Sequence, residues 1–168
     1  LSKSRGDVIL QERLEGEEFG VFYIRHPDEA QGRIFSITTK RLPTLTGDGV
    51  RTVEELLFDD DRAVTMARVS CENLAERLDE VPAPGESVPL AHLGTHCQGA
   101  VFLDGQQLKT DALQAAIDHI AKGFDGFFFG RFDLRAASAE ALMAGRGLRI
   151  IELNGLTSEA THIYDPST

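Results

Sequence analysis

Two short strings in the C-terminal third decide the fold: Gly130-Arg131-Phe132-Asp133-Leu134 and Ile150-Ile151-Glu152-Leu153-Asn154-Gly155. Each follows or contains an apolar run of the kind that forms strands. Because side chains alternate between the two faces of a strand, Arg131 and Asp133 share one face. By the same rule, Glu152 and Asn154 share a face of the second strand. The connection, residues 136–147, is too long for a tight hairpin but suits a looser antiparallel pair.

If the two polar faces coincide, two carboxylates, one amide oxygen and one guanidinium converge on one spot. Three oxygen ligands without sulfur or imidazole suit a hard cation such as Mg2+. The alternative is that Asp133, Glu152 and Arg131 form an ordinary cross-strand ion-pair set. Charged groups are seldom placed inside such apolar runs unless they are paired or bind a metal, which favours the functional interpretation.

Length and composition indicate one α+β domain. The chain has 168 residues, of which 42% are hydrophobic and 26% charged, enough for one real core. We predict that residues 1–168 form a single domain, and we see no repeat. Because the sequence leads almost directly into strand-like residues without an initiator Met, we expect it to be a piece of a longer protein.

Charge and cysteine usage exclude some classes of partner. The net charge of −10, from 27 acidic and 17 basic residues, argues against nucleic-acid binding. No apolar run approaches the roughly 18 residues of a membrane span. The two cysteines, Cys71 and Cys97, lack Cys-x-x-Cys spacing and indicate a reducing, cytoplasmic location.

The order of elements predicts helices packed on a mostly antiparallel sheet. Strands are expected at residues 7–13, 19–26 and 33–40 (an antiparallel meander), at 88–93 and 100–103, and in the two strings above. A loop is expected at residues 43–49. Helices are expected after Thr52, with Glu55 completing a capping box, from residue 60 or 61 to about 78, and at 111–122 after Thr110.

Glu152-x-Asn154 after Arg131-x-Asp133, combined with Leu14-x-Gly16-x-Glu18-Phe19, resembles the ATP-grasp superfamily. The branches it most resembles are D-alanine–D-alanine ligase, glutathione synthetase and cyanophycin-synthetase-like carboxylate–amine ligases. Residues 46–56 also look like the GDG-x-x-T-x-x-E-L stretch of the last branch, whereas residues 94–99 depart from its polar loop. The resemblance covers about residues 8–158. It implies the C-terminal ATP-grasp subdomain, without the substrate domain and the glycine-rich phosphate loop.

The resemblance assigns roles residue by residue. Residues 11–14 would form the hinge strand that lines adenine, with contacts from Gln11, Glu12 and Leu14. Glu18 would bind the ribose hydroxyls, and Lys40 would reach the nucleotide phosphates. Asp133, Glu152 and Asn154 would hold Mg2+, with Glu152 bridging two ions; Mn2+ could substitute. Arg131 would be catalytic, steadying the transferred phosphate or the tetrahedral intermediate. Taken alone, Glu18 could be a surface residue, Lys40 a solvated strand end, and His96 and Cys97 loop packing or substrate contacts.

The activity implied is an ATP- and Mg2+-dependent ligase that activates a carboxylate as an acylphosphate and joins it to an amine. Its partners would be the small-molecule carboxylate and amine and the missing N-terminal part of the protein, with no nucleic acid and no membrane. Without the missing subdomain, the face that normally closes on it would be exposed, so the fragment could self-associate. The fragment alone would be inactive. The alternatives are a non-catalytic nucleotide- or metal-binding regulatory module and an ATP-grasp kinase of a small molecule.

Overall fold

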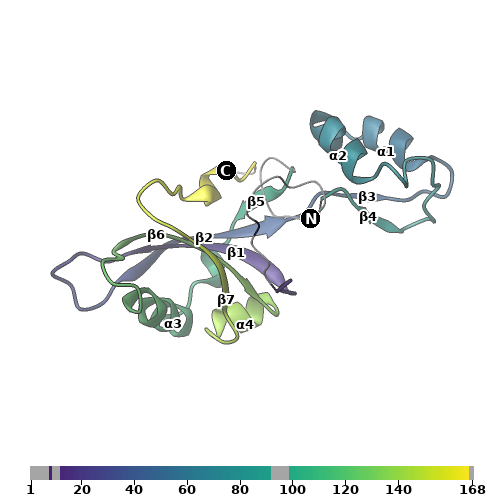
Figure 1. The fold of residues 1–168 in the computed structure, drawn as a ribbon. Coiled ribbons are helices and arrows are strands. Elements are labelled where there is room, and N and C mark those ends of the chain that lie inside the picture. Colours follow the sequence, from purple (N-terminus) through teal and green to yellow (C-terminus); the bar gives the residue numbers. More distant parts are fainter. Residues whose placement is uncertain (1–7, 9–11, 92–98, 167–168) are drawn as a thin grey trace.

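The computed structural model describes residues 8, 12–91 and 99–166. The main sheet has five antiparallel strands in the order β5-β2-β1-β6-β7 (Figure 1). Its strands are β1 (Glu17–Ile24), β2 (Arg33–Arg41), β5 (Val101–Asp104), β6 (Phe129–Ala136) and β7 (Arg149–Asn154). The other elements are β3 (Thr44–Thr46), β4 (Ser87–Pro89), α1 (Val53–Asp59), α2 (Ala67–Asn73), α3 (Asp111–Lys122), α4 (Ala139–Met143) and the 3-10 turns η1 (Ala63–Met66), η3 (Gln106–Leu108) and η4 (Thr161–Tyr164).

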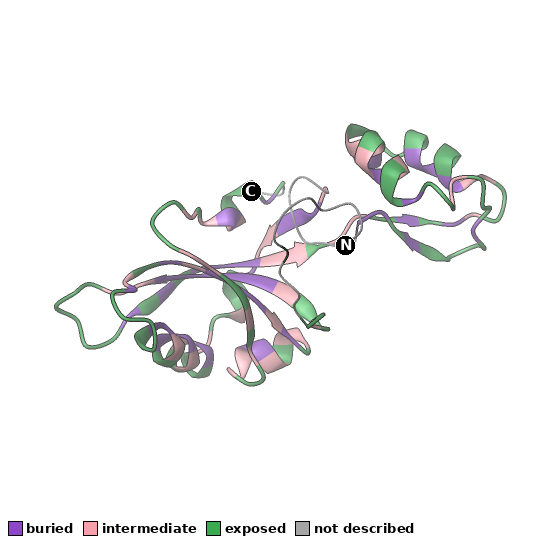
Figure 2. Ribbon diagram, viewed as in Figure 1, coloured by how far each residue is buried: buried purple, intermediate pink, exposed green. Residues whose placement is uncertain are grey.

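One face of the main sheet is covered by α3 and α4 and forms the larger core (Figures 1 and 2). The strand side chains of this core alternate with those of the opposite face, as the pleat requires. The core is filled by Phe19, Val21, Tyr23, Ile34, Ile37, Phe132, Leu134 and Ala136 from the strands, and by Leu113, Ile117, Ala121 and Leu142 from the helices. The opposite face carries polar side chains of β1, β2, β6 and β7, together with the aromatic pair Phe22 and Phe129.

A smaller unit stands beside the main sheet and has its own hydrophobic cluster (Figure 1). It consists of the antiparallel pair β3–β4 with α1 and α2, which lie between these two strands in the sequence. Its buried residues are Leu45, Val53, Leu56, Leu57, Ala63, Leu74, Val88 and Leu90. At the start of α1, Thr52 and Glu55 form the predicted capping box, which satisfies two backbone donors of the first turn. The prediction of a single domain for residues 1–168 stays a prediction.

The α+β class and the antiparallel pairing of the last two strands are confirmed. Across β6 and β7, Asp133 lies opposite Glu152 and Arg131 opposite Asn154. The expected long helix over residues 60–78 is wrong. The Asp60 side chain accepts hydrogen bonds from the backbone N–H groups of residues 62 and 63, so the chain turns into η1 before α2 begins. Helix α2 then ends at Asn73 with Leu74 as its C-cap, and the following residues form successive turns.

Other local expectations need smaller corrections. The expected loop at residues 43–49 contains β3, which is paired with β4. The connection between β6 and β7 contains the short helix α4, capped by the side chain of Ser138. Of the strand expected at residues 7–13, the described residues Val8, Glu12 and Arg13 lie outside helix and strand, and the rest fall outside the described residues. Within the described part of the chain, none of the helices has the length and apolarity to cross a membrane.

Candidate functional site

The candidate site lies on the face of the main sheet opposite α3 and α4. Strand register brings its members together, because Glu18 of β1 lies opposite Arg135 of β6, and Gly20 lies opposite Asp133. Lys40 enters the same face from β2, and its ammonium reaches both carboxylates of that face. Residues from four strands, separated by up to 136 positions in the sequence, thus form one polar cluster.

Asp133 is the centre of the cluster and is 5% exposed. Its Oδ1 accepts hydrogen bonds from Lys40 Nζ at 3.2 Å and from Arg131 Nε at 3.0 Å. Its Oδ2 accepts from the second guanidinium nitrogen of Arg131 and from Asn154 Nδ2, both at 3.1 Å. A carboxylate offers about four lone-pair positions, so the acceptor capacity of Asp133 is filled by two cations and an amide.

Glu18 is held differently, with one cation on each oxygen. Lys40 Nζ lies 2.8 Å from Oε1, and a guanidinium nitrogen of Arg135 lies 3.2 Å from Oε2. The side chains of Lys40 and Glu18 are only 7% and 16% exposed. Lys40 is therefore no solvated strand end, and Glu18 is no ordinary surface residue. About one lone pair remains on each oxygen of Glu18, so the carboxylate can still accept two hydrogen bonds from a ligand.

The segment after β7 borders the site. Arg131 donates a third guanidinium hydrogen bond, from Nη1, to the backbone carbonyl of Glu159 at 2.8 Å. Thr161 at the start of η4 donates to Thr38 of β2 at 3.0 Å in a buried position. The Asp165 carboxylate accepts from the backbone N–H of Asp104 at 2.7 Å. These contacts fix residues 155–166 against β2 and β5, and they link the Arg131 guanidinium to that segment.

The predicted metal ligands meet on this face. Asp133 and Glu152 are cross-strand partners, and Asn154 donates to Asp133. Among the described residues no group of three or more His, Cys, Asp and Glu side chains is placed to hold a metal. The predicted set instead has two carboxylates and one amide, and its oxygen chemistry fits Mg2+. Glu152 is exposed and, in the part of the chain described, has no hydrogen-bond or ion-pair partner.

The ion pairs of the alternative interpretation are present as well, since Arg131 and Asp133 form a bidentate pair. The ion-pair interpretation is therefore met for Arg131 and Asp133, and the metal-binding interpretation stays a prediction. A metal ion can bind the Asp133 carboxylate only if Lys40, Arg131 or Asn154 releases its hydrogen bond to one of the Asp133 oxygens.

The predicted adenine-lining residues are described in part. Gln11 lies outside the described residues, and Glu12 and Leu14 lie outside any strand, so the described part of the expected hinge strand is absent. The two described residues are nevertheless tied to the sheet. The carbonyl of Leu14 accepts from Arg135 at 2.6 Å, and the carboxylate of Glu12 pairs with Arg149 at 2.7 Å.

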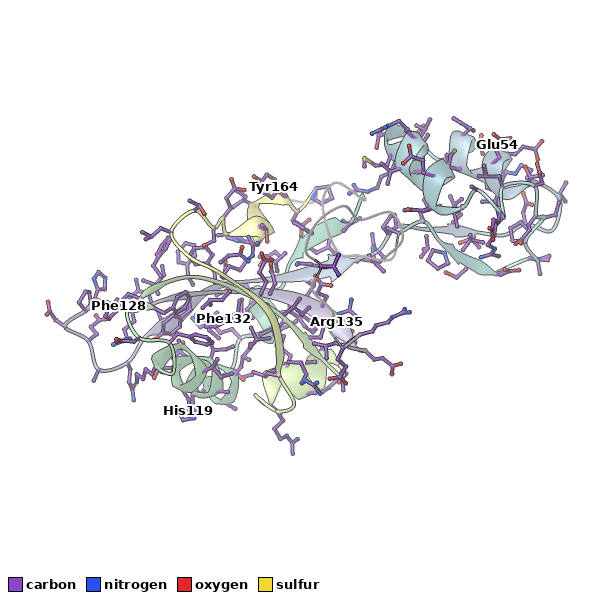
Figure 3. The ribbon with its side chains drawn as sticks, in the orientation of Figure 1. Glu54, His119, Phe128, Phe132, Arg135 and Tyr164 are labelled. Carbon is purple, nitrogen blue, oxygen red and sulfur yellow. The ribbon has the colours of Figure 1, made fainter. Side chains whose placement is uncertain are left out.

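Two members of the site were missed in the sequence. A Cβ built on Gly20 would lie 3.2 Å from Arg131 Cδ and 3.5 Å from Asp133 Oδ1, so a glycine here lets these side chains lie across β1. A glycine inside a strand is a signal of such close approach. The second missed member of the site is Arg135, which continues the two-residue period of Arg131 and Asp133 and so lies on the same face. It lies at the opposite end of β6 from Phe128 (Figure 3).

The remaining motifs lie elsewhere. Asp48 of the Gly-Asp-Gly stretch belongs to the smaller unit, where it closes the turn before α1. Hydrogen bonds from the backbone and side chain of Arg51, and then from the backbone of Val50, lower the pKa of the Asp48 carboxyl to about 2. His96 and Cys97 fall outside the described residues. Cys71 packs at the edge of the smaller hydrophobic cluster, in line with a core role.

Comparison with known proteins supports the fold. No family profile and no curated protein matches the chain. Among solved structures it is similar to a bifunctional glutathione synthetase from Pasteurella multocida, with a TM-score of 0.55 and 17% sequence identity. The match covers 91% of this chain and 22% of that one, so the chain spans about a fifth of its neighbour. At this identity the similarity establishes the fold alone, an α+β fold that this chain shares with part of that synthetase.

Proposed function

We propose that this chain supplies the nucleotide- and metal-binding half of an ATP- and Mg2+-dependent ligase that activates a carboxylate as an acylphosphate and joins it to an amine. One observation carries the proposal. Glu18, Lys40, Arg131, Asp133, Glu152 and Asn154, each given a role by sequence resemblance, gather on one sheet face of an ATP-grasp-like fold. These positions come from four strands, so their convergence does not follow from any one motif.

The proposed roles follow from the contacts of each side chain. Lys40 and Arg131 are cations held within 3.2 Å of Asp133, and phosphate oxygens would compete with Asp133 for both of them. Once they turn to phosphate, the oxygens of Asp133 become available beside those of Glu152 and Asn154. Mg2+ bound by these three residues would neutralise the developing charge on the phosphates. Arg131 would hold the transferred phosphoryl group through its planar, permanently charged guanidinium.

Calorimetric titration tests the proposal. Mg·ATP would be titrated into the chain, and into the longer protein wherever the native reading frame extends upstream of Leu1. Each would be compared with the double variant Asp133→Asn plus Glu152→Gln. We expect weak binding by the chain, tighter binding by the longer protein, and loss of both in the double variant. Binding that the double variant retains, or no Mg·ATP binding by either wild-type protein, would contradict the proposal.

One observation favours a second candidate, a non-catalytic binding module. Asp133 is fully satisfied by side chains of the same face, so the cluster is self-contained without a ligand. A regulatory module would bind nucleotide and release it unchanged with every acceptor, whereas the ligase would release ADP and phosphate once a carboxylate and an amine are both supplied. A small-molecule kinase would release a phosphorylated product without an amide.

A further inference from the structure

Arg135 is a cation of the site face that has no role in the proposed reaction, yet it makes two contacts there. One guanidinium nitrogen lies 3.2 Å from Glu18 Oε2, and another donates to the carbonyl of Leu14 at 2.6 Å. Leu14 belongs to the segment proposed to line adenine, and Glu18 is the carboxylate proposed to accept the ribose hydroxyls. A single planar side chain therefore joins the two parts of the site that would hold a nucleoside.

The surroundings of Arg135 fix its position. It projects from β6 opposite Glu18 of β1, and its side chain is 21% exposed. Its cross-strand partner on β7 is Arg149, which pairs with the carboxylate of Glu12. Glu12 belongs to the same segment before β1 as Leu14. The two arginines thus attach residues 12–14 to the sheet at successive points. Only Arg135 also reaches a carboxylate of the site.

Two acidic residues of the site, Asp133 and Glu18, differ in the number of further hydrogen bonds that they can accept. Asp133 has four donors on its two oxygens, whereas Glu18 has one donor on each. Glu18 can therefore accept one further hydrogen bond per oxygen, which matches the two neighbouring hydroxyls of a ribose. If Lys40 turns to phosphate, Arg135 becomes the partner that keeps the Glu18 carboxylate in place.

We propose that Arg135 is a positioning residue that makes the site selective for ribonucleotides over 2′-deoxyribonucleotides, by holding Glu18 in register with the adenine-lining segment. This inference rests on the proposed nucleotide site. Arg135 itself touches neither ligand nor metal in this scheme. Its effect is transmitted through the orientation of Glu18, so losing it removes the preference for the 2′-hydroxyl.

The test is a nuclear magnetic resonance titration of the full chain with Mg·ATP and with Mg·2′-deoxyATP, because shift changes report weak binding. Wild type should bind ATP about tenfold more tightly, the effect of one hydrogen bond to a charged group. Arg135→Met should reduce the ratio nearly to one, and Arg135→Lys should restore part of it. Arg68→Met, an exposed arginine on α2, serves as the matched control and should keep the wild-type ratio.

A double variant distinguishes positioning through Glu18 from a separate structural effect. If Arg135 acts through Glu18, Glu18→Gln with Arg135→Met should have the same ratio as Glu18→Gln alone. An unchanged ratio in Arg135→Met, or additive effects in the double variant, would overturn the inference. If Arg135→Met does not fold, Arg135→Lys carries the same comparison. Wild-type binding without ribose preference would overturn this inference alone, whereas no wild-type binding would overturn the proposed function too.

Discussion

At the scale of single residues, the saturation of Asp133 has a measurable consequence. Lys40 Nζ lies 3.2 Å from Asp133 Oδ1, so it repels any metal ion that approaches without a nucleotide. We expect Lys40→Met to strengthen binding of Mn2+ alone several-fold and to weaken binding of Mn·ATP. Electron paramagnetic resonance of free Mn2+ would measure both. The control is Arg41→Met, because Arg41 is exposed next to Lys40 on β2 and should leave both affinities unchanged.

Weaker binding of Mn2+ alone by Lys40→Met would contradict this account.

The sequence predicted which residues share a face, because the two-residue period of a strand fixes that for Arg131 and Asp133. It could not predict that Lys40 is buried. That burial depends on β2 lying beside β1 and on the segment after β7 packing against β2. Such contacts join residues that are far apart in the sequence.

A buried residue pair predicts a pH dependence of stability. The Tyr23 hydroxyl donates to Asp118 at 2.6 Å, and burial, followed by this hydrogen bond, raises the pKa of Tyr23 from 10.0 to about 12. Below pH 10 the tyrosine is protonated in both states, so its full contribution is present. Between pH 10 and 12 the unfolded state ionises first, and the free energy of unfolding falls.

We therefore expect the wild type to lose stability over this alkaline range at up to about 1.4 kcal/mol per pH unit more than Tyr23→Phe. Urea unfolding at several alkaline pH values would measure the difference. Equal slopes for the two proteins would show that Tyr23 keeps an ordinary pKa. Asp118 also accepts from the backbone N–H of Gly32 at 2.8 Å and from Lys122, so the pair ties the β1–β2 connection to α3.

At the scale of elements, the capping box at α1 is the best-predicted feature. Thr52 accepts from the backbone N–H of Glu55 at 3.2 Å, and the Glu55 carboxylate accepts from the backbone N–H of Thr52 at 2.8 Å. We expect Thr52→Ala to lower the free energy of unfolding by about 1 kcal/mol. Thr52→Ser, which keeps the hydroxyl, should lose much less. Equal losses in both variants, measured by urea unfolding, would mean that the hydroxyl contributes nothing.

The broken helix over residues 60–78 shows where local patterns stop being sufficient. A stripe at helical spacing predicted one helix, but the Asp60 side chain caps a new turn at residues 62 and 63. Beyond α2, the Asn73 side chain donates to the carbonyl of Leu90 at 3.2 Å. That contact lies 17 residues away, so the end of α2 depends partly on packing against the segment after β4.

At the scale of the whole molecule, the two hydrophobic clusters belong to different parts of the chain. The larger one lies between the main sheet and α3 with α4, and the smaller one lies within residues 44–90. The α+β class followed from the order of predicted elements. The assembly of the site did not, because a five-stranded order in which β1 lies between β2 and β6 is a long-range arrangement. The sequence resemblance assigned roles to the residues of the site, and those roles stay predictions.

The central claim is that the sheet face bearing Asp133, Glu152 and Asn154 binds a metal–nucleotide complex. Paramagnetic broadening of amide signals by Mn·ATP tests it most directly, because the effect falls steeply with distance from the ion. The account predicts that signals of β6 and β7 around these three residues broaden first, while those of α3 on the opposite face stay sharp. Broadening centred on the exposed acidic residues 59–61 of the smaller unit, or none at all, would contradict it.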